Sequence, residues 1–382
     1  MFSKIKILQC VYSMNRGGVE TWLMHVLRTI DRNRYHMDFV VHTSLPGSFD
    51  SEIRALGSSI YVVKSPAYPF KHFRDIEMIL LKNGPYDVIH SHDATFNGAA
   101  MKIGYKCGIP LRIIHSHSDV RKSLPSNLIN RLYTQWSIIE SKRHANVGLA
   151  CSTIAAHSYY GNNWQHDPRW RVLSYSESFA PFHDNISPIA IRRELGFPED
   201  SFIIGHVGSF RDGQKNHSLI IKITQQLSAQ DPSIFFLLIG EGILRKEIER
   251  MAAQAGIANR IIFTGSRNDV PHCMLGAMNV FLFPSLYEGL GLVMVEAQAA
   301  GLPCLCSDVV PHEADIVPEL VKRIPLSESP ANWAKTLIAM KNSPLKYSKQ
   351  KALELVEKSN FNISTSIKTL EALYSLSKDS KI

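Results

Sequence analysis

Residues 280–301 read VFLFPSLYEGLGLVMVEAQAAG: an apolar run of strand type, a turn with two glycines, and a helical pattern. Two acids, Glu288 and Glu296, stand eight positions apart in this otherwise apolar stretch. A strand that enters a helix through such a turn is typical of parallel α/β sheets, whose ligands bind at the carboxyl ends of the strands. The polar residues of these turns are therefore the first candidates for a binding site.

The same alternation of short apolar strands and longer amphipathic helices runs through the whole chain. The expected strands are KIKILQCV, MDFVVHT, SIYVVKS, DVIHSH, LRIIHSH and NVGLACS, then FIIGHVGS, FFLLIGEG, RIIFTGS, VFLFPS and PCLCSD. Near-continuous apolar strands between helices indicate parallel sheets covered on both faces. The pattern lapses at 174–188 and then restarts, so the 382 residues predict two Rossmann-like α/β domains.

Composition is that of a globular protein, with 45% apolar and 20% charged residues. No run approaches eighteen apolar residues, and Lys4 and Lys6 interrupt an N-terminal run that is too short for a signal peptide. The six cysteines show no CxxC spacing and mostly fall in apolar runs, where reduced cysteine acts as a small hydrophobe. These features predict a cytoplasmic protein.

The positive charge is concentrated in the first half of the chain. Residues 1–175 carry 21 Lys and Arg against 12 Asp and Glu, or +9, whereas residues 176–382 balance at −1. No nucleic-acid motif accompanies this charge, which argues against a nucleic-acid partner. An anionic membrane surface or a phosphate-bearing substrate fits the first half better.

Three strand-to-helix turns of the second half carry glycines or cations. They contain Gly240-Glu241-Gly242, Arg211 with Lys215, and Gly289 with Gly291 before a helix from about Leu292. Free N–H groups at a helix start bind anions, and the two cations could hold a diphosphate without a metal. Glu296 would then accept hydrogen bonds from a ribose, and Glu288 would meet a sugar hydroxyl. Each feature alone is often ordinary turn geometry or a solvated charge; their recurrence at successive strand ends predicts a nucleotide-sugar site.

At this point the chain resembles a family. EGLGLVMVE matches the E-x7-E signature of the retaining glycosyltransferase family 4, of GT-B fold, and five further segments agree in order along nearly the whole chain. Among them are ILQCVYSMNRGGVETWLMHVL, IIGHVGSFRDGQKNH and LLIGEGILRKEIE. The similarity is to the capsular and exopolysaccharide branch. It implies an acceptor-side domain at 1–180, a donor domain at 181–360, and a C-terminal helix at 361–382 that crosses back.

The resemblance also implies roles for particular residues. Phosphate binding and catalysis fall to Arg211 and Lys215, with Glu288 and His117 beside the transferred sugar and His115 as the second choice for that histidine. Main-chain contacts to the base are expected around Arg267–Val270. The remaining donor-binding residues of this assignment are Gly17, Gly18, Gly208, Gly240, Glu241, Gly242, Arg267, Val270, Gly289, Leu290, Gly291, Leu292 and Glu296.

Two HSH triplets, His90-Ser91-His92 and His115-Ser116-His117, follow expected strands of the first half. Paired H-x-H could ligate zinc, although histidine at sheet ends is more often a polar contact. No D-x-D triplet occurs in the chain, so a metal-bound donor site is unsupported. We expect no metal and no cofactor, the nucleotide sugar being a substrate.

Residues 126–144, SNLINRLYTQWSIIESKRH, place Leu128, Ile129, Leu132, Tyr133, Trp136 and Ile139 at helical spacing, with Arg131, Lys142 and Arg143 alongside. Such a stripe more often faces a core. Attachment to anionic lipid is the alternative that the basic first half supports.

Together these observations predict a cytoplasmic, peripheral membrane enzyme that moves a sugar from a nucleoside diphosphate, UDP favoured, to a growing and lipid-linked saccharide. An epimerase of similar fold, a non-catalytic saccharide-binding relative and a zinc hydrolase built on the HSH triplets are the alternatives. Turnover without acceptor would indicate the epimerase, and metal analysis would identify the hydrolase. Intact Glu288, Glu296, Lys215 and glycine turns argue against a non-catalytic relative.

Overall fold

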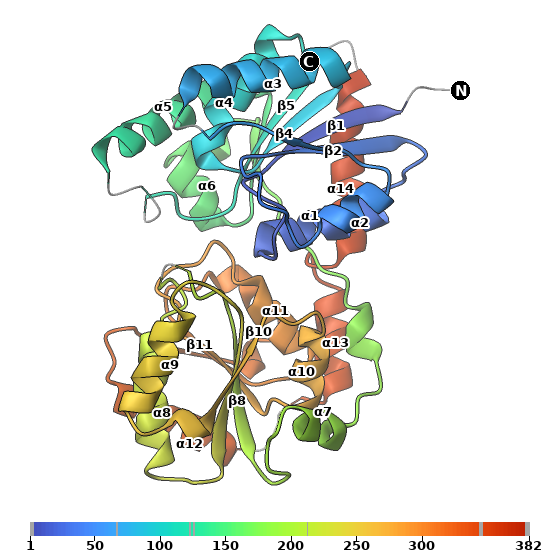
Figure 1. The fold of residues 1–382 in the computed structure, drawn as a ribbon. Helices are drawn as coiled ribbons and strands as arrows, with labels where there is room; N and C mark the ends of the chain where they lie inside the picture. The colour runs from blue at the N-terminus through green and yellow to red at the C-terminus, as the bar shows by residue number, and fades with distance from the viewer. Residues whose placement is uncertain are drawn as a thin grey trace. The chain divides into compact units, whose positions relative to one another are not determined.

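The computed structural model describes residues 4–65, 68–121, 124, 127–211, 213–343 and 347–378. The chain forms two compact units (Figure 1). Unit 1 comprises Met1–Glu177 and Ile363–Ile382, and unit 2 comprises Ser178–Asn362. Each unit is a parallel sheet with helices, so the predicted two-domain α/β class is confirmed.

In the described part of unit 1, parallel strands form one seven-stranded sheet in the order β3-β2-β1-β4-β5-β6-β7. The strands are β1 Ile5–Cys10, β2 Tyr35–Val41, β3 Ile60–Val62, β4 Val88–Ser91, β5 Leu111–Ser116, β6 Val147–Ala150 and β7 Trp170–Val172. The chain winds outward from β1 to β3 and then returns to β4 on the other side of β1. The winding direction therefore reverses between β1 and β4, where open α/β sheets bind their ligands.

The helices of unit 1 cover both faces of this sheet. They are α1 Gly18–Thr29, α2 Asp50–Ala55, α3 Pro69–Asn83, α4 Ala94–Lys106, α5 Leu128–His144, α6 Thr153–Tyr160 and α14 Ile363–Ser375. Right-handed crossovers place α1 and α2 on one face and α3 to α6 on the other. Accordingly α4 packs between α3 and α5, while α14 packs against α1 (Figure 1).

In the described part of unit 2, six parallel strands form a second sheet in the order β10-β9-β8-β11-β12-β13. The strands are β8 Phe202–Val207, β9 Ile234–Ile239, β10 Ile261–Gly265, β11 Val280–Phe283, β12 Cys304–Ser307 and β13 Val321–Ile324. The helices are α7 Pro188–Glu194, α8 His217–Ser228, α9 Arg245–Gln254, α10 Val270–Gly276, α11 Leu292–Ala299, α12 Pro330–Lys341 and α13 Lys349–Glu357. Here the winding direction reverses between β8 and β11.

The C-terminal helix α14 is an integral part of unit 1. Tyr374 is fully buried, and its hydroxyl accepts a hydrogen bond of 3.2 Å from Nε2 of Gln9 in β1. The hydroxyl of Tyr35 in β2 donates to the Glu371 carbonyl at 3.0 Å. The last helix thus contacts the middle of a sheet formed more than 300 positions earlier in the chain.

Helix α5 corrects one expectation. We expected its apolar stripe to face the core, but Leu128, Ile129, Leu132 and Ile139 are exposed, and only Tyr133 and Trp136 are half-buried. The buried residues of α5 are instead Thr134, Ser137, Glu140 and Ser141. Most of these inward side chains are small, which allows α4 to approach α5 closely. Ser126, the first residue of the predicted segment, lies outside the described residues.

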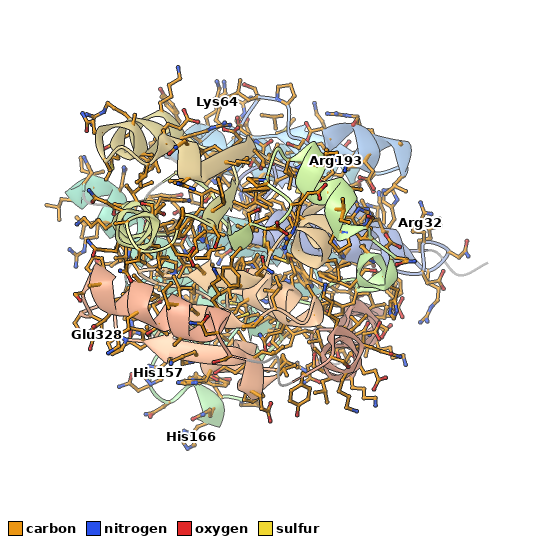
Figure 2. The ribbon with its side chains drawn as sticks, turned by 90° about the horizontal axis from the view of Figure 1, so that it is seen from below. Arg32, Lys64, His157, His166, Arg193 and Glu328 are labelled. Carbon is orange, nitrogen blue, oxygen red and sulfur yellow. The ribbon has the colours of Figure 1, made fainter. Side chains whose placement is uncertain are left out.

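Charged side chains such as Arg32 of unit 1 and Arg193 of unit 2 lie on the outside of their units (Figure 2). Five of the six cysteines are buried, and across the described residues none forms a disulfide. Within those same ranges, no helix combines the length and hydropathy needed to cross a membrane.

Candidate functional site

The predicted donor residues of unit 2 follow the carboxyl ends of its strands, with Lys215 and Glu288 at the reversal between β8 and β11. Lys215, in the loop after β8, places its Nζ 2.6 Å from Oε1 of Glu288, in the loop after β11. The two side chains are 15% and 6% exposed. The sequence predicts separate roles for them, Lys215 with the phosphates and Glu288 with the sugar. The structure makes them one nearly buried ion pair that stands over the Phe283 ring, 4.8 Å from Nζ.

Three hydrogen bonds fasten the two loops to each other. The Gln214 side chain donates to the Tyr287 carbonyl at 2.9 Å, and its own carbonyl accepts from the Leu286 N–H at 2.8 Å. Asn216 has a left-handed φ of 55° and donates from its side chain to the Pro284 carbonyl at 3.1 Å. Lys215 is therefore held between two residues that fix its loop, so its ammonium is preorganised.

Glycine allows the loops after β8 and β9 to lie in direct backbone contact. A Cβ at Gly240 would overlap the carbonyl oxygen of Gly208, and one at Gly242 would overlap the carbonyl of Phe210. A Cβ at Gly208 would lie 2.7 Å from Cγ of Lys215. The predicted glycines are thus needed for packing around Lys215. Glu241, between them, pairs with Arg245.

Arg211 is exposed on the loop after β8. It lies four positions before Lys215, and its backbone N–H nitrogen is close to Gly242, where an added Cβ would lie 2.9 Å away. An exposed guanidinium on this loop is free to turn toward an anion above Lys215. Of the two cations expected to bind the phosphates, Lys215 is therefore fixed and Arg211 lies on the surface.

The second acid lies on α11, which begins after Gly291. Gly291 has a φ of 85°, a left-handed conformation that favours glycine, and the flanking Leu290 and Leu292 are buried. Burial raises the pKa of Glu296 from 4.5 to about 7. A carboxyl with such a pKa changes charge near neutral pH, so it can both accept from and donate to a pair of ribose hydroxyls.

Arg267 and Val270 lie in the turn from β10 to α10. The Arg267 guanidinium donates to Asp269 at 2.6 Å and to Glu194 of α7 at 2.8 Å. These carboxylates raise the pKa of Arg267 above its ordinary value. The side chain is thus committed to neighbours, and main-chain groups of this turn remain the predicted contacts to a base.

In unit 1, Gly17 is the N-cap of α1 and Gly18 its first residue. A Cβ at Gly17 would overlap the Glu20 carboxylate, so that carboxylate lies over the start of the helix. A phosphate at this N-terminus would share the position with a negative side chain. The Glu20 carboxylate is therefore an obstacle to the predicted donor-binding role of these glycines wherever that role involves a phosphate.

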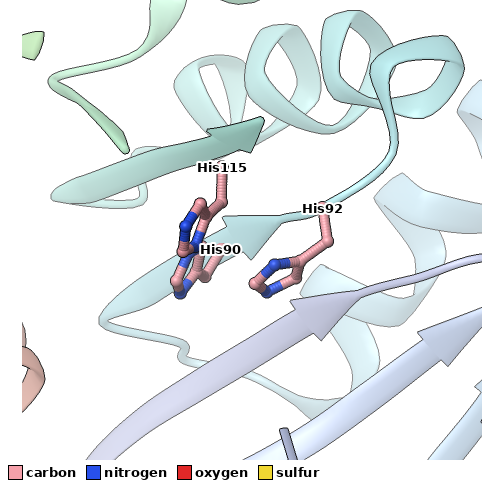
Figure 3. A group of neighbouring side chains, drawn as sticks. All are labelled: His90, His92 and His115. Carbon is pink, nitrogen blue, oxygen red and sulfur yellow. The ribbon is translucent and has the colours of Figure 1, made fainter. Parts of the chain in front are cut away.

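His90, His92, His115 and His117 lie together where β4 and β5 end, beside the reversal between β1 and β4 (Figure 3 shows the first three). Nε2 of His92 donates to Oε1 of Gln9 at 2.8 Å, and Nδ1 of His92 lies 2.8 Å from Nε2 of His117. Nδ1 of His90 lies 2.9 Å from the Tyr374 hydroxyl. A continuous hydrogen-bond chain thus connects His117 to the C-terminal helix.

These imidazoles are neutral at physiological pH. Burial lowers the pKa of His115 to about 3, and burial lowers the pKa of His90, His92 and His117 well below 6.5. Among the described residues, Nδ1 of His117, Nε2 of His90 and both nitrogens of His115 are buried without a hydrogen-bond partner. Trp22 and Tyr175 cover the group, the Tyr175 ring stacking on His117 at 5.1 Å.

Ligand nitrogens of His90, His92 and His115 lie within 4.8 Å of one another, and neutral imidazole suits a transition metal. Nitrogens on tetrahedral zinc are about 3.4 Å apart, so the group would have to contract. His92 would also have to give up one of its two hydrogen bonds. The present geometry therefore fits a hydrogen-bonded network better than a metal centre.

A cavity of about 240 Å³ adjoins this histidine group within unit 1. Its lining residues include Tyr12, Glu20, His92, Asp93 and Thr134. An aromatic ring with carboxylates and hydroxyls suits the apolar faces and hydroxyls of a saccharide. Sequence reasoning missed this cavity, and it also missed Gln9 and Tyr374, which only tertiary contacts bring together with His92.

Two family models match the chain. Glycosyltransferase Family 4 matches residues 16–163, and Glycosyl transferases group 1 matches residues 189–354. The chain is 32% identical over 344 residues to a Bacillus subtilis protein named as glycosyltransferase EpsF, covering 88% of this chain and 87% of that protein.

Other relatives extend the comparison. The chain is 23% identical over 319 residues to the Escherichia coli UDP-Gal:alpha-D-GlcNAc-diphosphoundecaprenol alpha-1,3-galactosyltransferase, covering 80% of each. Anabaena HepE, solved in complex with UDP and glucose, superposes with a TM-score of 0.82 at 17% identity, over 97% of this chain and 99% of that one. This likeness of fold confirms the predicted GT-B architecture.

Proposed function

The chain belongs to the glycosyltransferases of the group 1 and family 4 type, and from that premise we propose a retaining, metal-independent hexosyltransferase of surface-polysaccharide synthesis. It transfers a sugar from a nucleoside diphosphate, with UDP as the favoured carrier, to a hydroxyl of a growing, lipid-linked saccharide. The HepE complexes with UDP and UDP-glucose support the choice of base, and the Escherichia coli relative supports a diphosphate-lipid acceptor.

The observation that carries this proposal is the Lys215–Glu288 pair. It joins a cation suited to phosphate and an anion suited to a sugar hydroxyl, 2.6 Å apart, at the reversal point of the unit 2 sheet. A nucleotide sugar presents these two groups next to each other, with the diphosphate attached to the sugar ring. The pair therefore offers neighbouring partners for the diphosphate and the sugar that the reaction separates.

As the bond between the sugar and the diphosphate breaks, negative charge grows on the departing phosphate oxygen. Lys215 is already fixed at this place, and Arg211 can add its charge from the surface of the same loop. Preorganised cations of this kind stabilise a developing anion without the cost of reorganising water. Two such side chains supply the charge that a divalent metal would supply elsewhere, so we propose chemistry without a metal.

In unit 1, His117 is the group that we propose beside the transferred sugar. It is neutral, and its buried Nδ1 is without a partner among the described residues, so it can form a hydrogen bond with a sugar hydroxyl. The adjoining cavity of about 240 Å³ is the proposed entrance for the acceptor saccharide. Because that acceptor is lipid-linked, we place the enzyme on the inner face of the cell membrane.

Thermal unfolding with a panel of UDP- and GDP-sugars tests the donor assignment, because a ligand of the folded state raises the melting temperature by mass action. We expect UDP-sugars to raise it and the Lys215→Met variant to lose the rise. Incubation of the bound donor with a diphosphate-lipid saccharide should then give a product one sugar heavier by mass spectrometry. Absence of any nucleotide effect would overturn the proposal.

A further inference from the structure

We infer that the outward face of α5, together with the first turn of α3, is a docking surface for anionic lipid. The inference builds on the proposed membrane location and uses none of the donor-site residues. It starts from the orientation of α5, whose apolar side chains face outward and whose polar side chains face the protein. A helix on the surface of a water-soluble domain has the reverse arrangement.

Apolar residues of α5 form one outward stripe. Ile129, Leu132, Trp136 and Ile139 follow one another at intervals of three and four residues, which is the spacing of one helix face, and Trp136 is half-buried. Ile129, Leu132 and Ile139 are 76%, 57% and 63% exposed. Contiguous exposed apolar side chains of this kind mark sites that bind a protein or a membrane.

Hydrogen bonds lock the opposite face of α5 to the protein. The Ser137 hydroxyl donates to the Ala94 carbonyl of α4 at 2.7 Å and accepts from the Gly98 N–H at 2.8 Å. A Cβ at Gly98 would lie 2.5 Å from Cα of Ser137, so the two helices are in backbone contact there. The helix therefore cannot rotate to bury its stripe, and the stripe remains available to a partner.

The apolar surface continues onto α3. The Phe73 ring lies 5.8 Å from the Trp136 ring. Phe70, one helical turn earlier, is 93% exposed, and Tyr68 just before the helix is also exposed. Aromatic and aliphatic side chains from two neighbouring helices thus form one surface.

Charge identifies the partner. The same two helices carry exposed cations, namely Lys71 and Arg74 on α3 and Arg131 and Arg143 on α5. The acid of α5, Glu140, is buried and pairs with Lys102 at 2.9 Å. Apolar side chains flanked by Lys and Arg are the pattern of an interfacial helix on anionic lipid, and the +9 balance of residues 1–175 adds to the attraction.

The experiment measures co-sedimentation of the full chain with vesicles of phosphatidylcholine alone or with added phosphatidylglycerol. We expect binding that requires phosphatidylglycerol and that falls as salt rises. Leu132→Ser should weaken it at least fivefold. The matched control is Ile189→Ser on α7 of unit 2, because Leu132 and Ile189 are 57% and 56% exposed. Arg131→Glu should also weaken binding, whereas Arg193→Glu, an equal charge change on unit 2 (Figure 2), should not.

Both α5 positions are exposed, so the variants should keep the melting temperature and the response to UDP-sugars of the parent chain. Loss of vesicle binding with an intact donor response separates this inference from the donor assignment. Equal binding to neutral vesicles, or unchanged binding by Leu132→Ser and Arg131→Glu, would overturn it. So would a dimer in solution that Leu132→Ser converts to a monomer, because the surface would then be covered by a second copy.

Discussion

Nδ1 of His92 lies 2.8 Å from Nε2 of His117, and this contact determines which nitrogen of His117 carries its proton. The Gln9 carbonyl oxygen accepts from Nε2–H of His92, so His92 must be unprotonated at Nδ1. His117 then donates from Nε2 and presents an unprotonated Nδ1 to the proposed sugar site. The Gln9 amide is oriented in turn by the Tyr374 hydroxyl, to which it donates at 3.2 Å.

The first prediction concerns this chain of hydrogen bonds from Tyr374 to His117. Gln9→Met removes the amide at similar length, so the fixed tautomer of His117 is lost. Turnover should fall about tenfold, the cost of one hydrogen bond, while donor affinity stays the same. Nitrogen NMR of labelled histidine should show Nδ1 of His117 changing from an unprotonated signal to an averaged one. An unchanged His117 spectrum would contradict this positioning role for Gln9.

The second prediction separates binding from stability at the Lys215–Glu288 pair. Lys215→Met should weaken diphosphate affinity by about 1.5–3 kcal/mol and also destabilise the fold, because Glu288 would be left buried and unpaired. The double variant Lys215→Met/Glu288→Gln should recover the stability but not the affinity. Calorimetric titration with UDP and denaturant unfolding measure the two effects.

The Lys341–Asp231 pair of the same unit provides the control, since its atoms also lie 2.6 Å apart. Lys341→Met/Asp231→Asn should leave UDP affinity at the parent value. Recovery of UDP affinity in the double variant at positions 215 and 288 would mean that the pair is structural.

The third prediction follows from the raised pKa of Glu296, about 7 against an ordinary 4.5. Between pH 4.5 and about pH 7 the folded state holds a proton that the unfolded state has lost. The contribution of Glu296 to the free energy of unfolding therefore falls as pH rises. At pH 8 the folded state must hold this carboxylate in its charged form, which burial disfavours. Glu296→Gln should therefore raise the free energy of unfolding at pH 8 and leave it unchanged at pH 4.

The same variant should bind UDP about tenfold more weakly, because an amide replaces the acceptor of the ribose hydroxyls. A residue that lowers the stability of the fold but raises the affinity for a ligand is typical of a functional site. If Glu296→Gln were less stable at pH 8, or bound UDP normally, the ribose assignment would be wrong.

The sequence predicted most of the sheets, because continuous apolar runs bury strands on both faces. It missed β7 and β13, whose sequences WRV and VKRI carry cations and lie at sheet edges. Helical spacing located the α5 stripe but could not tell which side faced the protein. That depended on Ser137 meeting Gly98, a contact between residues 39 positions apart.

In the candidate site, too, local sequence predicted some features, and others depended on the tertiary fold. Glycines and cations at strand ends identified the donor loops from local sequence. The pairing of Lys215 with Glu288, separated by 73 positions, exists because β8 and β11 are neighbours in the sheet. Gln9 gave no sequence signal, since a polar residue within a strand has many ordinary explanations. The HSH spacing did mark His92, but as a zinc ligand and not as the hydrogen-bond partner of His117.

The fourth prediction concerns metal. Transfer activity should survive EDTA, because Lys215 and Arg211 provide the positive charge at the diphosphate. Metal analysis of the chelated protein should accompany the assay, so that retained activity is measured on metal-free chain. Loss of activity that magnesium or zinc restores would contradict the proposed role of the two cations.

The fifth prediction tests the glycine packing around Lys215. Gly240 has a φ of 149°, and its added Cβ would overlap the Gly208 carbonyl oxygen, a backbone atom that cannot turn aside. Gly256 of the same unit has a φ of 70° with no atom near its added Cβ. Gly256→Ala should cost only the backbone strain, about 1–2 kcal/mol, and should keep UDP affinity. Gly240→Ala should cost more and displace the loop that carries Lys215, so UDP affinity should fall at least tenfold. Equal effects of the two substitutions on UDP affinity would show that the backbone contact does not position Lys215.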